Sequence, residues 1–364
     1  MSKKRNIRDS TQNEPSINNV LPKRASGREA PLPIGPPVIL SSTSINAFES
    51  ISDLDGVVEN PSAEIATLSI RSTRDSDSDG VLLREYIIPP HASFVLCTLP
   101  LLQPEPLANP IPGLPLSQRF NLILFDPSWP NRSVRRSREY YTHSYNEMDI
   151  LTQRLKDILR VHAYRRCDDV LFTEESATDT ASATAQASDE MQTSSQESFA
   201  AIWITNSEKA RKVAYEALLG SGFNLYEEWV WIKVTSDGQP VCPVDGVWRK
   251  PYEILVIGRM GKDLQPLHDI SMAPDSGNLL GVDPATITRR VIAAVPDLHS
   301  RKPNLRALFA SLLFGSEPSQ YDAGPNPECY SAIEVFARNL TAGWLAAGNE
   351  VLKFNARECW IESA

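Results

Sequence analysis

The sequence has few of the features that mark secreted, metal-stabilised or membrane proteins. Its five cysteines, at positions 97, 167, 242, 329 and 359, are odd in number, widely spaced and form no CxxC pair. We therefore expect neither a disulfide framework nor structural zinc, and a reducing intracellular compartment fits best. No apolar run approaches the roughly 20 residues that a spanning helix needs. The start, MSKKRNIRDS, has no apolar stretch behind its charges, so we expect no membrane span and no secretory signal.

Several common catalytic motifs are also missing. The five histidines, at positions 91, 143, 162, 268 and 299, include no pair four residues apart, so we expect no metal site on a helix. The chain has no Walker loop, no GxGxxG and no GxSxG, which argues against a phosphate-binding loop, a simple dinucleotide fingerprint and a hydrolase nucleophile elbow.

The charge is acidic overall but uneven. The 364 residues include 36 Lys and Arg against 45 Asp and Glu, a net charge of −9. Residues 1–30 nevertheless carry seven basic and three acidic side chains, and a second basic run contains Arg132, Arg135, Arg136 and Arg138. An acidic protein with local basic patches can still bind phosphate. The runs KKR and LPKR permit a nuclear address.

Composition divides the chain into three parts. Residues 1–37 are polar, basic and Pro-rich without a hydrophobic period, so we expect a disordered tail. Residues 38–91 form a variable N-terminal extension, with a strand-like run EIATLSI. Residues 92–364 form the main domain. Inside it, residues 168–198 are rich in Ser, Thr, Ala and acids, with little to bury, and are expected to be a disordered insertion. Residues 263–284 and 315–330 read as further loops.

Strand and helix patterns alternate along the main domain. We expect strands at SFVLC (93–97), FNLILF (120–125), AAIWITN (200–206), EWVWIKV (228–234), YEILVIG (252–258), SAIEVFA (331–337) and EVLKF (350–354). Helical spacing predicts helices in NEMDILTQRLKDILR, EKARKVAYEALL and NLRALFASLLF, the last opened by Pro303 in its first turn. This alternation predicts an α/β sheet that binds its ligand at the carboxyl ends of the strands.

The most informative segment is FNLILFDPSW, in which Asp126, Pro127, Ser128 and Trp129 directly follow an apolar strand. A carboxylate, a rigid turn and an aromatic ring together suit methylation of an exocyclic amine on a planar base. The amine is a poor nucleophile because its lone pair is delocalised into the ring. A carboxylate and a carbonyl that accept its N–H protons turn the lone pair toward an electrophile, while the aromatic ring stacks on the base. On these four residues alone, an ordinary Asp-Pro turn followed by a core tryptophan is favoured over the methylation hypothesis.

Other segments in the same order resemble the adenine N6-methyltransferases of the MT-A family, named for the seventy-kilodalton adenosine methyltransferase subunit, and in particular its methyltransferase-like protein 4 branch. The resemblance runs from about residue 92 to about residue 355. It is carried by DPSWPNRSVRRS (126–137), IWITN (202–206), EWVWIKV (228–234), RKPYEILVIGR (249–259), LHSRKPNL (298–305), and EVFARNL with GNEVLKF (334–354).

This resemblance implies a circularly permuted, Rossmann-like class I methyltransferase fold with S-adenosylmethionine as cofactor. It implies that Asp126 orients the target amine, that Trp129 stacks on the base and that Lys302 meets the cofactor carboxylate. The remaining cofactor positions implied are Cys97, Thr98, Glu334, Arg338, Asn339, Asn349 and Glu350.

Each residue also has an ordinary structural explanation. Lys302 is consistent with a solvent-exposed residue in the first turn of a helix. Arg338 is consistent with a weak ion pair at the surface, and Asn349 with a turn residue. Arg132, Arg135 and Arg136 are expected either to position phosphates beside the pocket or to form an exposed basic loop. Because these residues occur together and in the same order as the motifs of the family, the interpretation that they bind the cofactor is favoured.

Two departures from the family pattern leave a second hypothesis open. The motif is usually Asp-Pro-Pro-Trp, and Ser128 loses the φ near −65° that proline fixes. Thr98 stands where relatives often carry an Asp. The expected function is N6-adenine methylation of nucleic acid, RNA rather than DNA, and the alternative is a weak or inactive scaffold subunit. An adenine in a duplex has to be flipped out, whereas one in single-stranded RNA does not.

Overall fold

The computed structural model describes most of the main domain and the segment before it. The described residues are 35–72, 82–103, 105–129, 148–165, 198–246, 250–260, 287–298, 301–315 and 330–360. The expected tail 1–37 lies outside them up to residue 34. The expected insertion 168–198 lies outside them up to residue 197. The expected loop 263–284 and all but the two end residues of 315–330 also fall outside.

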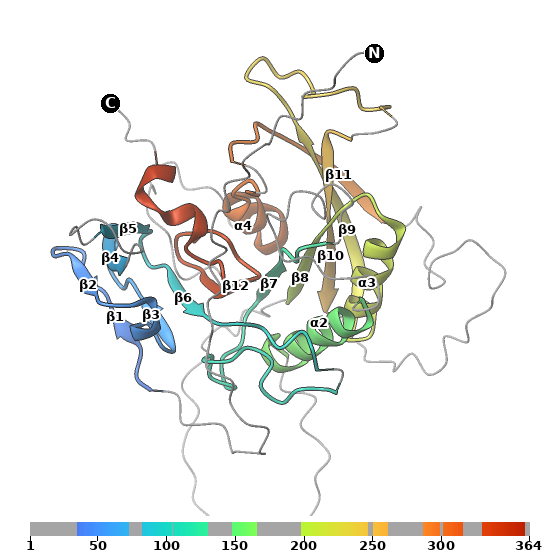
Figure 1. The fold of residues 1–364 in the computed structure, drawn as a ribbon. Helices are drawn as coiled ribbons and strands as arrows, with labels where there is room; N and C mark the ends of the chain where they lie inside the picture. The colour runs from blue at the N-terminus through green and yellow to red at the C-terminus, as the bar shows by residue number, and fades with distance from the viewer. Residues whose placement is uncertain are drawn as a thin grey trace, which may run out of the picture. The chain divides into compact units, whose positions relative to one another are not determined.

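A ten-stranded mixed sheet forms the centre of the fold (Figure 1), in the order β1-β3-β6-β13-β12-β7-β8-β10-β9-β11. Its middle is parallel, with β6 (Ser93–Leu96), β13 (Leu345–Gly348), β12 (Ala332–Val335), β7 (Leu122–Phe125) and β8 (Phe199–Ile204) running in one direction. β10 (Tyr252–Met260) is antiparallel to both β8 and β9 (Phe223–Lys233), and β11 (Thr288–Ala294) pairs parallel to β9 at the sheet edge. The carboxyl ends of five strands therefore meet at one edge of the sheet.

The middle strands are buried on both faces, as their near-continuous apolar runs predict. On one face, Ile123, Phe125 and Ile202 pack in the same core cluster as α2 (Met148–His162) and α3 (Glu208–Leu219). On the other face, Leu124 and Trp203 pack with α4 (Arg306–Phe314). The alternation of neighbouring residues between two cores follows from the two-residue period of a strand.

The segment before residue 92 adds strands to the sheet and a small sheet of its own. β1 (Val38–Ile39) and β3 (Val57–Glu59) extend the large sheet beyond β6. β2 (Asn46–Phe48), β4 (Ala66–Ser72) and β5 (Leu82–Ile88) form a three-stranded sheet. A third core cluster joins this region to the main domain, because it contains residues of β4 and β6 together with Ala346, Val351 and Leu352.

Most predicted elements are confirmed, including the strands at SFVLC, FNLILF, AAIWITN, EWVWIKV, YEILVIG and SAIEVFA and the three helices. The strand predicted at EVLKF is wrong. The strand is β13, which ends at Gly348, and residues 353–355 form the 3-10 helix η6 (Lys353–Asn355), followed by η7 (Arg357–Cys359). The apolar run misled because Val351, Leu352 and Phe354 are buried by packing, not by strand pairing.

The start of α4 also differs from the prediction. Pro303 precedes the helix, which begins at Arg306, so the segment from Lys302 to Leu305 is a loop. The helix ends at Phe314 and is capped by Gly315, whose φ of 65° is the left-handed conformation that glycine adopts without strain. Lys302 is therefore presented by a loop between β11 and α4.

Candidate functional site

The site is built where the carboxyl ends of β7 and β12 lie side by side. Asp126 follows β7 directly, and its backbone N–H donates to the carbonyl of Val335, the last residue of β12, at 3.1 Å. Phe336, next along the chain, has a φ of 61°, which is uncommon for a residue other than glycine. The sharp turn there carries Arg338 back toward Asp126, so two neighbouring strands each contribute one charged residue.

Asp126 is buried between two cations. Its Oδ1 lies 2.9 Å from Nζ of Lys302, and its Oδ2 lies 3.6 Å from Nη1 of Arg338. The aspartate is 4 % exposed and Arg338 is 7 % exposed. Ion pairs with so little water around them are stronger electrostatically than surface pairs, but each member depends on its partner because an unpaired buried charge is costly.

Lys302 and Arg338 each hold a second carboxylate. Lys302 Nζ is 3.2 Å from Oε2 of Glu253, a residue of β10, and Arg338 Nε is 3.6 Å from Oε2 of Glu350. Glu253 is also 2.5 Å from Lys233 Nζ, and Glu350 is 2.9 Å from Lys353 Nζ. Positive and negative groups thus alternate along the carboxyl edge of the sheet from β9 to η6.

The charges set the protonation of these groups. Burial opposes the ionised forms of both Glu253 and Lys302. For Glu253, the positive charges of Lys302 and Lys233 outweigh burial and lower its pKa to about 2. For Lys302, the negative charges of Asp126 and Glu253 outweigh burial and raise its pKa. Both groups are therefore charged at neutral pH.

Glu334 is the exception in this network. It lies in β12, is 7 % exposed, and its carboxylate makes no hydrogen bond or ion pair that involves the described residues. Burial, and to a smaller extent the charge of Asp126, raises its pKa to about 8, although Lys302 and Arg338 act in the opposite direction. Near neutral pH the side chain is mostly a neutral acid, and a positive charge placed beside it would favour the carboxylate.

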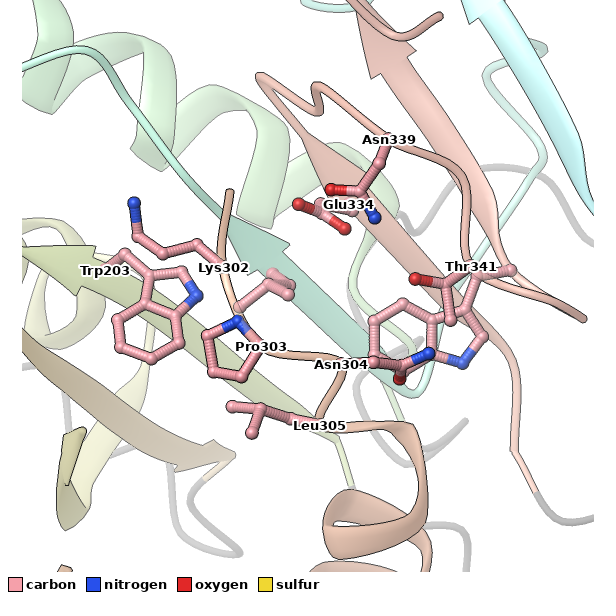
Figure 2. Close-up of a pocket in the computed structure, with 10 residues that line it drawn as sticks. Trp203, Lys302, Pro303, Asn304, Leu305, Glu334, Asn339 and Thr341 are labelled. Carbon is pink, nitrogen blue, oxygen red and sulfur yellow. The ribbon is translucent and has the colours of Figure 1, made fainter. Parts of the chain in front are cut away.

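A pocket opens beside Glu334 (Figure 2). Its lining includes Lys302, Asn304, Glu334 and Asn339, together with the rings of Trp203 and Trp344. The side chain of Lys302 extends toward Trp203, and its Nζ lies 5.8 Å from the centre of that ring. The groups that line it are an ammonium, a carboxyl, two amides and aromatic rings, and such groups bind the charged and planar parts of ligands.

The predicted motif is fixed at both ends. Pro127 is buried and Ser128 half-buried, and the Oγ of Ser128 accepts a hydrogen bond from Arg338 Nη2 at 3.2 Å. Trp129 is 8 % exposed, belongs to the core cluster that includes α2 and α3, and donates from Nε1 to the carbonyl of Trp203 at 2.7 Å. In this structure Trp129 is a core tryptophan with its polar atom satisfied.

The other predicted cofactor positions lie along the same strand ends. Cys97 follows β6 and is buried, and burial raises the pKa of its thiol to about 12, so it is not a thiolate at neutral pH. Its backbone N–H donates to the carbonyl of Gly348 at 3.1 Å. Thr98 and Asn349 are exposed, and Asn339 is half-buried. Arg132, Arg135, Arg136 and His299 lie outside the described residues.

The sequence alone did not identify Glu253, Lys233 and the pocket tryptophans Trp203 and Trp344. The available signal was weak: Glu253 is an acid near the start of an otherwise apolar strand, in YEILVIG. Because β10 is antiparallel, with Ile254 opposite Ile204, its first residues lie at the carboxyl end of β8. Only that pairing places Glu253 beside Lys302.

Among the described residues, no group of three or more His, Cys, Asp or Glu side chains is arranged to hold a metal ion. A search of the same residues for a helix long and apolar enough to cross a membrane found none.

Comparison with known proteins gives a consistent family. Residues 187–350 match the MT-A70 family model, a range that begins after the Asp126–Trp129 motif. The chain is 35 % identical over 252 residues to "N6-methyladenosine RNA methyltransferase MTA1" of Cryphonectria parasitica, which covers 67 % of this chain and 55 % of that protein. It is 29 % identical over 279 residues to "N(6)-adenine-specific methyltransferase METTL4" of Mus musculus, covering 76 % and 45 %.

A third relative, "DNA N6-methyl methyltransferase" of Caenorhabditis elegans, is 23 % identical over 344 residues, covering 89 % of this chain and 75 % of that protein. The chain spans about half the length of the MTA1 and METTL4 proteins above. It carries an MT-A70 domain on a mixed α/β sheet, and its relatives include the METTL4 branch. Residues 187–350 therefore assign this part of the chain to the MT-A70 family.

Proposed function

We propose that this protein transfers a methyl group from S-adenosylmethionine to the N6 amine of adenine in nucleic acid, with RNA favoured over DNA. The observation that carries this proposal is the position of Asp126, at the carboxyl end of β7 and within 2.9 Å of Lys302 beside a pocket. The names of the family's other members support the reaction, and they include both RNA and DNA methyltransferases.

We further propose that the fold is a circularly permuted methyltransferase sheet. The parallel strands β6, β13, β12, β7 and β8 and the antiparallel β10 are spatially continuous. In the chain, however, β12 and β13 come after β7, β8 and β10. This order supports a permutation in which the half that carries the amine-binding motif precedes the half that opens the usual fold.

The pocket residues fit the proposed cofactor. S-adenosylmethionine supplies an electrophilic methyl group on a positively charged sulfonium, together with an amino acid end and an adenosine end. Glu334, buried at the pocket and without an ion pair among the described residues, suits the positive charge. Lys302 suits the carboxylate. Arg338, Asn339, Asn349, Glu350, Cys97 and Thr98, grouped near the ends of β12, β13 and β6, are the proposed ribose and adenine side.

The amine itself would meet Asp126 and a backbone carbonyl of the motif. The aspartate accepts one N–H, the carbonyl accepts the other, and the lone pair of the amine is then directed at the methyl group. The stacking role proposed for Trp129 requires its ring face to be uncovered when nucleic acid binds, since the ring is now 8 % exposed. Arg132, Arg135 and Arg136, which follow the motif, are proposed to hold phosphates.

Two observations favour a second candidate, an inactive scaffold that binds nucleic acid or a partner subunit. Ser128 replaces a proline of the family motif, and Trp129 is occupied in the core. A protein of this kind keeps the fold without needing Asp126 for turnover.

Radiolabelled methyl transfer to adenine-containing RNA and DNA separates the two candidates. The wild-type protein is expected to label one of them, and Asp126→Ala is expected to abolish the label. Calorimetric titration with S-adenosylhomocysteine is expected to show binding that Lys302→Ala and Asn349→Ala weaken. Titration without heat at millimolar ligand would remove the enzyme proposal, whereas binding without turnover above the Asp126→Ala background would support the scaffold.

A further inference from the structure

The hydroxyl of Ser128 takes part in a contact that proline cannot make. Arg338 Nη2 lies 3.2 Å from Ser128 Oγ and 3.4 Å from the backbone oxygen of Asp126, while Nη1 of the same guanidinium lies 3.6 Å from the Asp126 carboxylate. One buried arginine from the turn after β12 thus contacts the motif at a side-chain hydroxyl, a carbonyl and a carboxylate. Hydrogen bonds from a charged donor are stronger than neutral ones.

The two ends of the motif are held independently of this hydroxyl. The backbone N–H of Asp126 donates to Val335 at 3.1 Å, and the indole of Trp129 donates to Trp203 at 2.7 Å. The middle of the motif lacks the ring that would fix its backbone, because position 128 is a serine. Its position therefore depends on side-chain contacts.

We propose that Ser128 is a positioning residue: its hydroxyl, held by Arg338, fixes the backbone carbonyl that faces the target amine, in place of the ring restraint of proline. This inference rests on the proposed methyl transfer. It also links the two halves of the site, because Arg338 belongs to the turn after β12 and Ser128 to the motif after β7. A serine at this position is then a different solution to the same geometric requirement, and the motif remains competent for catalysis.

Three substitutions at position 128 test the proposal against the wild-type protein. Ser128→Ala removes the hydroxyl and is expected to lower kcat about tenfold, since small displacements of a reacting group have effects of this size or larger. Ser128→Thr keeps the hydroxyl and is expected to retain most of the activity. Ser128→Pro restores the ring without the hydroxyl and is expected not to exceed the wild type. A kcat for Ser128→Ala equal to the wild type, or a Ser128→Pro variant faster than the wild type, would overturn the proposal.

A matched control is Ser331→Ala. Ser331 precedes β12, and its Oγ lies 3.0 Å from Oδ1 of Asn121, which precedes β7. It therefore joins the same two strands at their opposite ends. This variant is expected to keep the wild-type kcat. Ser128→Ala is also expected to leave the dissociation constant for S-adenosylhomocysteine within about twofold, so that the loss lies in kcat.

Amide hydrogen exchange tests the restraint without requiring turnover. The peptide that contains residues 126–129 is expected to exchange faster in Ser128→Ala than in the wild type, and the peptide around Asn121 is expected to be unchanged. Equal exchange in the motif would overturn the positioning role even if the protein proves inactive. Absence of turnover in the wild type together with faster exchange in the variant would refute the proposed reaction and leave the restraint established.

Discussion

Two groups of buried carboxylates lie in the same sheet and differ in how they are satisfied. Glu227 and Glu228, in β9, are 3 % and 2 % exposed. Glu227 accepts two hydrogen bonds from Arg290 of β11, at 2.7 and 2.9 Å, and one from the indole of Trp229 at 2.6 Å. Glu228 accepts from Arg211, from the hydroxyl of Tyr215 at 2.9 Å and from Arg289 at 3.3 Å.

Asp126 and Glu334 are buried to a similar degree but lack this complete set of donors. Asp126 shares Lys302 with Glu253 and shares Arg338 with Glu350. Glu334 has no ion pair among the described residues, and its pKa is raised to about 8 by burial and by Asp126. The first group therefore has dedicated donors, whereas the second competes for a few cations.

The difference separates structure from chemistry within one sheet. Glu227 is bonded to β11, and Glu228 is bonded to both α3 and β11, so these contacts fix how the edge strand and the helix pack on β9. A fully bonded carboxylate has little capacity left for a ligand. A buried carboxylate that shares its cations with another acid can still gain a favourable electrostatic interaction from a ligand. Such carboxylates are therefore expected at a binding site.

The largest expected effect is that of Asp126→Asn. The amide is nearly the same size but is neutral, so it loses the ion pairs with Lys302 and Arg338, and its single carbonyl oxygen is a weaker acceptor for the target amine than the carboxylate. We expect turnover to fall at least about 100-fold, as for other groups that contact the reacting atoms. Measured kcat on an adenine-containing oligonucleotide checks this. Activity within a few-fold of the wild type would place Asp126 with the structural carboxylates instead.

The second effect is on stability, at the structural carboxylates. Glu227→Ala leaves Arg290 and the buried indole of Trp229 without this acceptor. We expect the free energy of unfolding to fall by about 2 kcal/mol. The loss is smaller than for a fully buried ion pair because Arg290 is half exposed. Thermal unfolding should shift downward by roughly 4–8 °C. Turnover per folded molecule should be kept below the transition. A normal melting temperature with lost turnover would contradict the comparison.

A third effect is a pH dependence that comes from Glu334. Its pKa in the folded state is about 8, above the ordinary value of 4.5. Between pH 4.5 and pH 8 the folded protein therefore keeps a proton on this group that the unfolded chain has lost. This group therefore makes the free energy of unfolding fall as the pH rises from about 4.5 to 8. Glu334→Gln should remove that contribution, so its melting temperature relative to the wild type should be higher at pH 9 than at pH 5. A difference in melting temperature between variant and wild type that is the same at pH 5 and pH 9 would show that Glu334 is already ionised at pH 5.

The smallest effect should come from Glu253→Gln, and its pH dependence has the opposite sign. The pKa of Glu253 is about 2, because Lys302 and Lys233 outweigh its burial, so its stabilising effect is present above about pH 4.5 and is lost as the pH falls toward 2. We expect a loss on the order of 1 kcal/mol at pH 7. Unfolding scans at pH 7 and pH 3 should show the two proteins converging in acid. Divergence in acid would contradict the assigned ion pairs.

The sequence predicted the central strands and the helices well where a single physical signal dominated. FNLILF and AAIWITN are apolar almost without a break, as strands buried on both faces are, and the Val213 stripe of EKARKVAYEALL has helical spacing. It failed at β13 and EVLKF. Leu345, Ala346 and Ala347 lack the β-branched residues typical of strands, whereas Val351, Leu352 and Phe354 are apolar but pack as a turn and a 3-10 helix.

Residue types and order by themselves determined an α/β sheet, an Asp-Pro motif directly after β7 and a resemblance to the MT-A family. Through the resemblance to that family, they also predicted site roles for Asp126, Lys302 and Arg338. Only the tertiary structure decided that these three form a single ion network, that Glu253 and Lys233 extend it, and that Ser128 accepts from Arg338. The physical reason is that the local hydrophobic pattern of the sequence specifies which face of a strand is buried. Which charged residues share a site is decided instead by the antiparallel pairing of β10 with β8 and by the turn at Phe336.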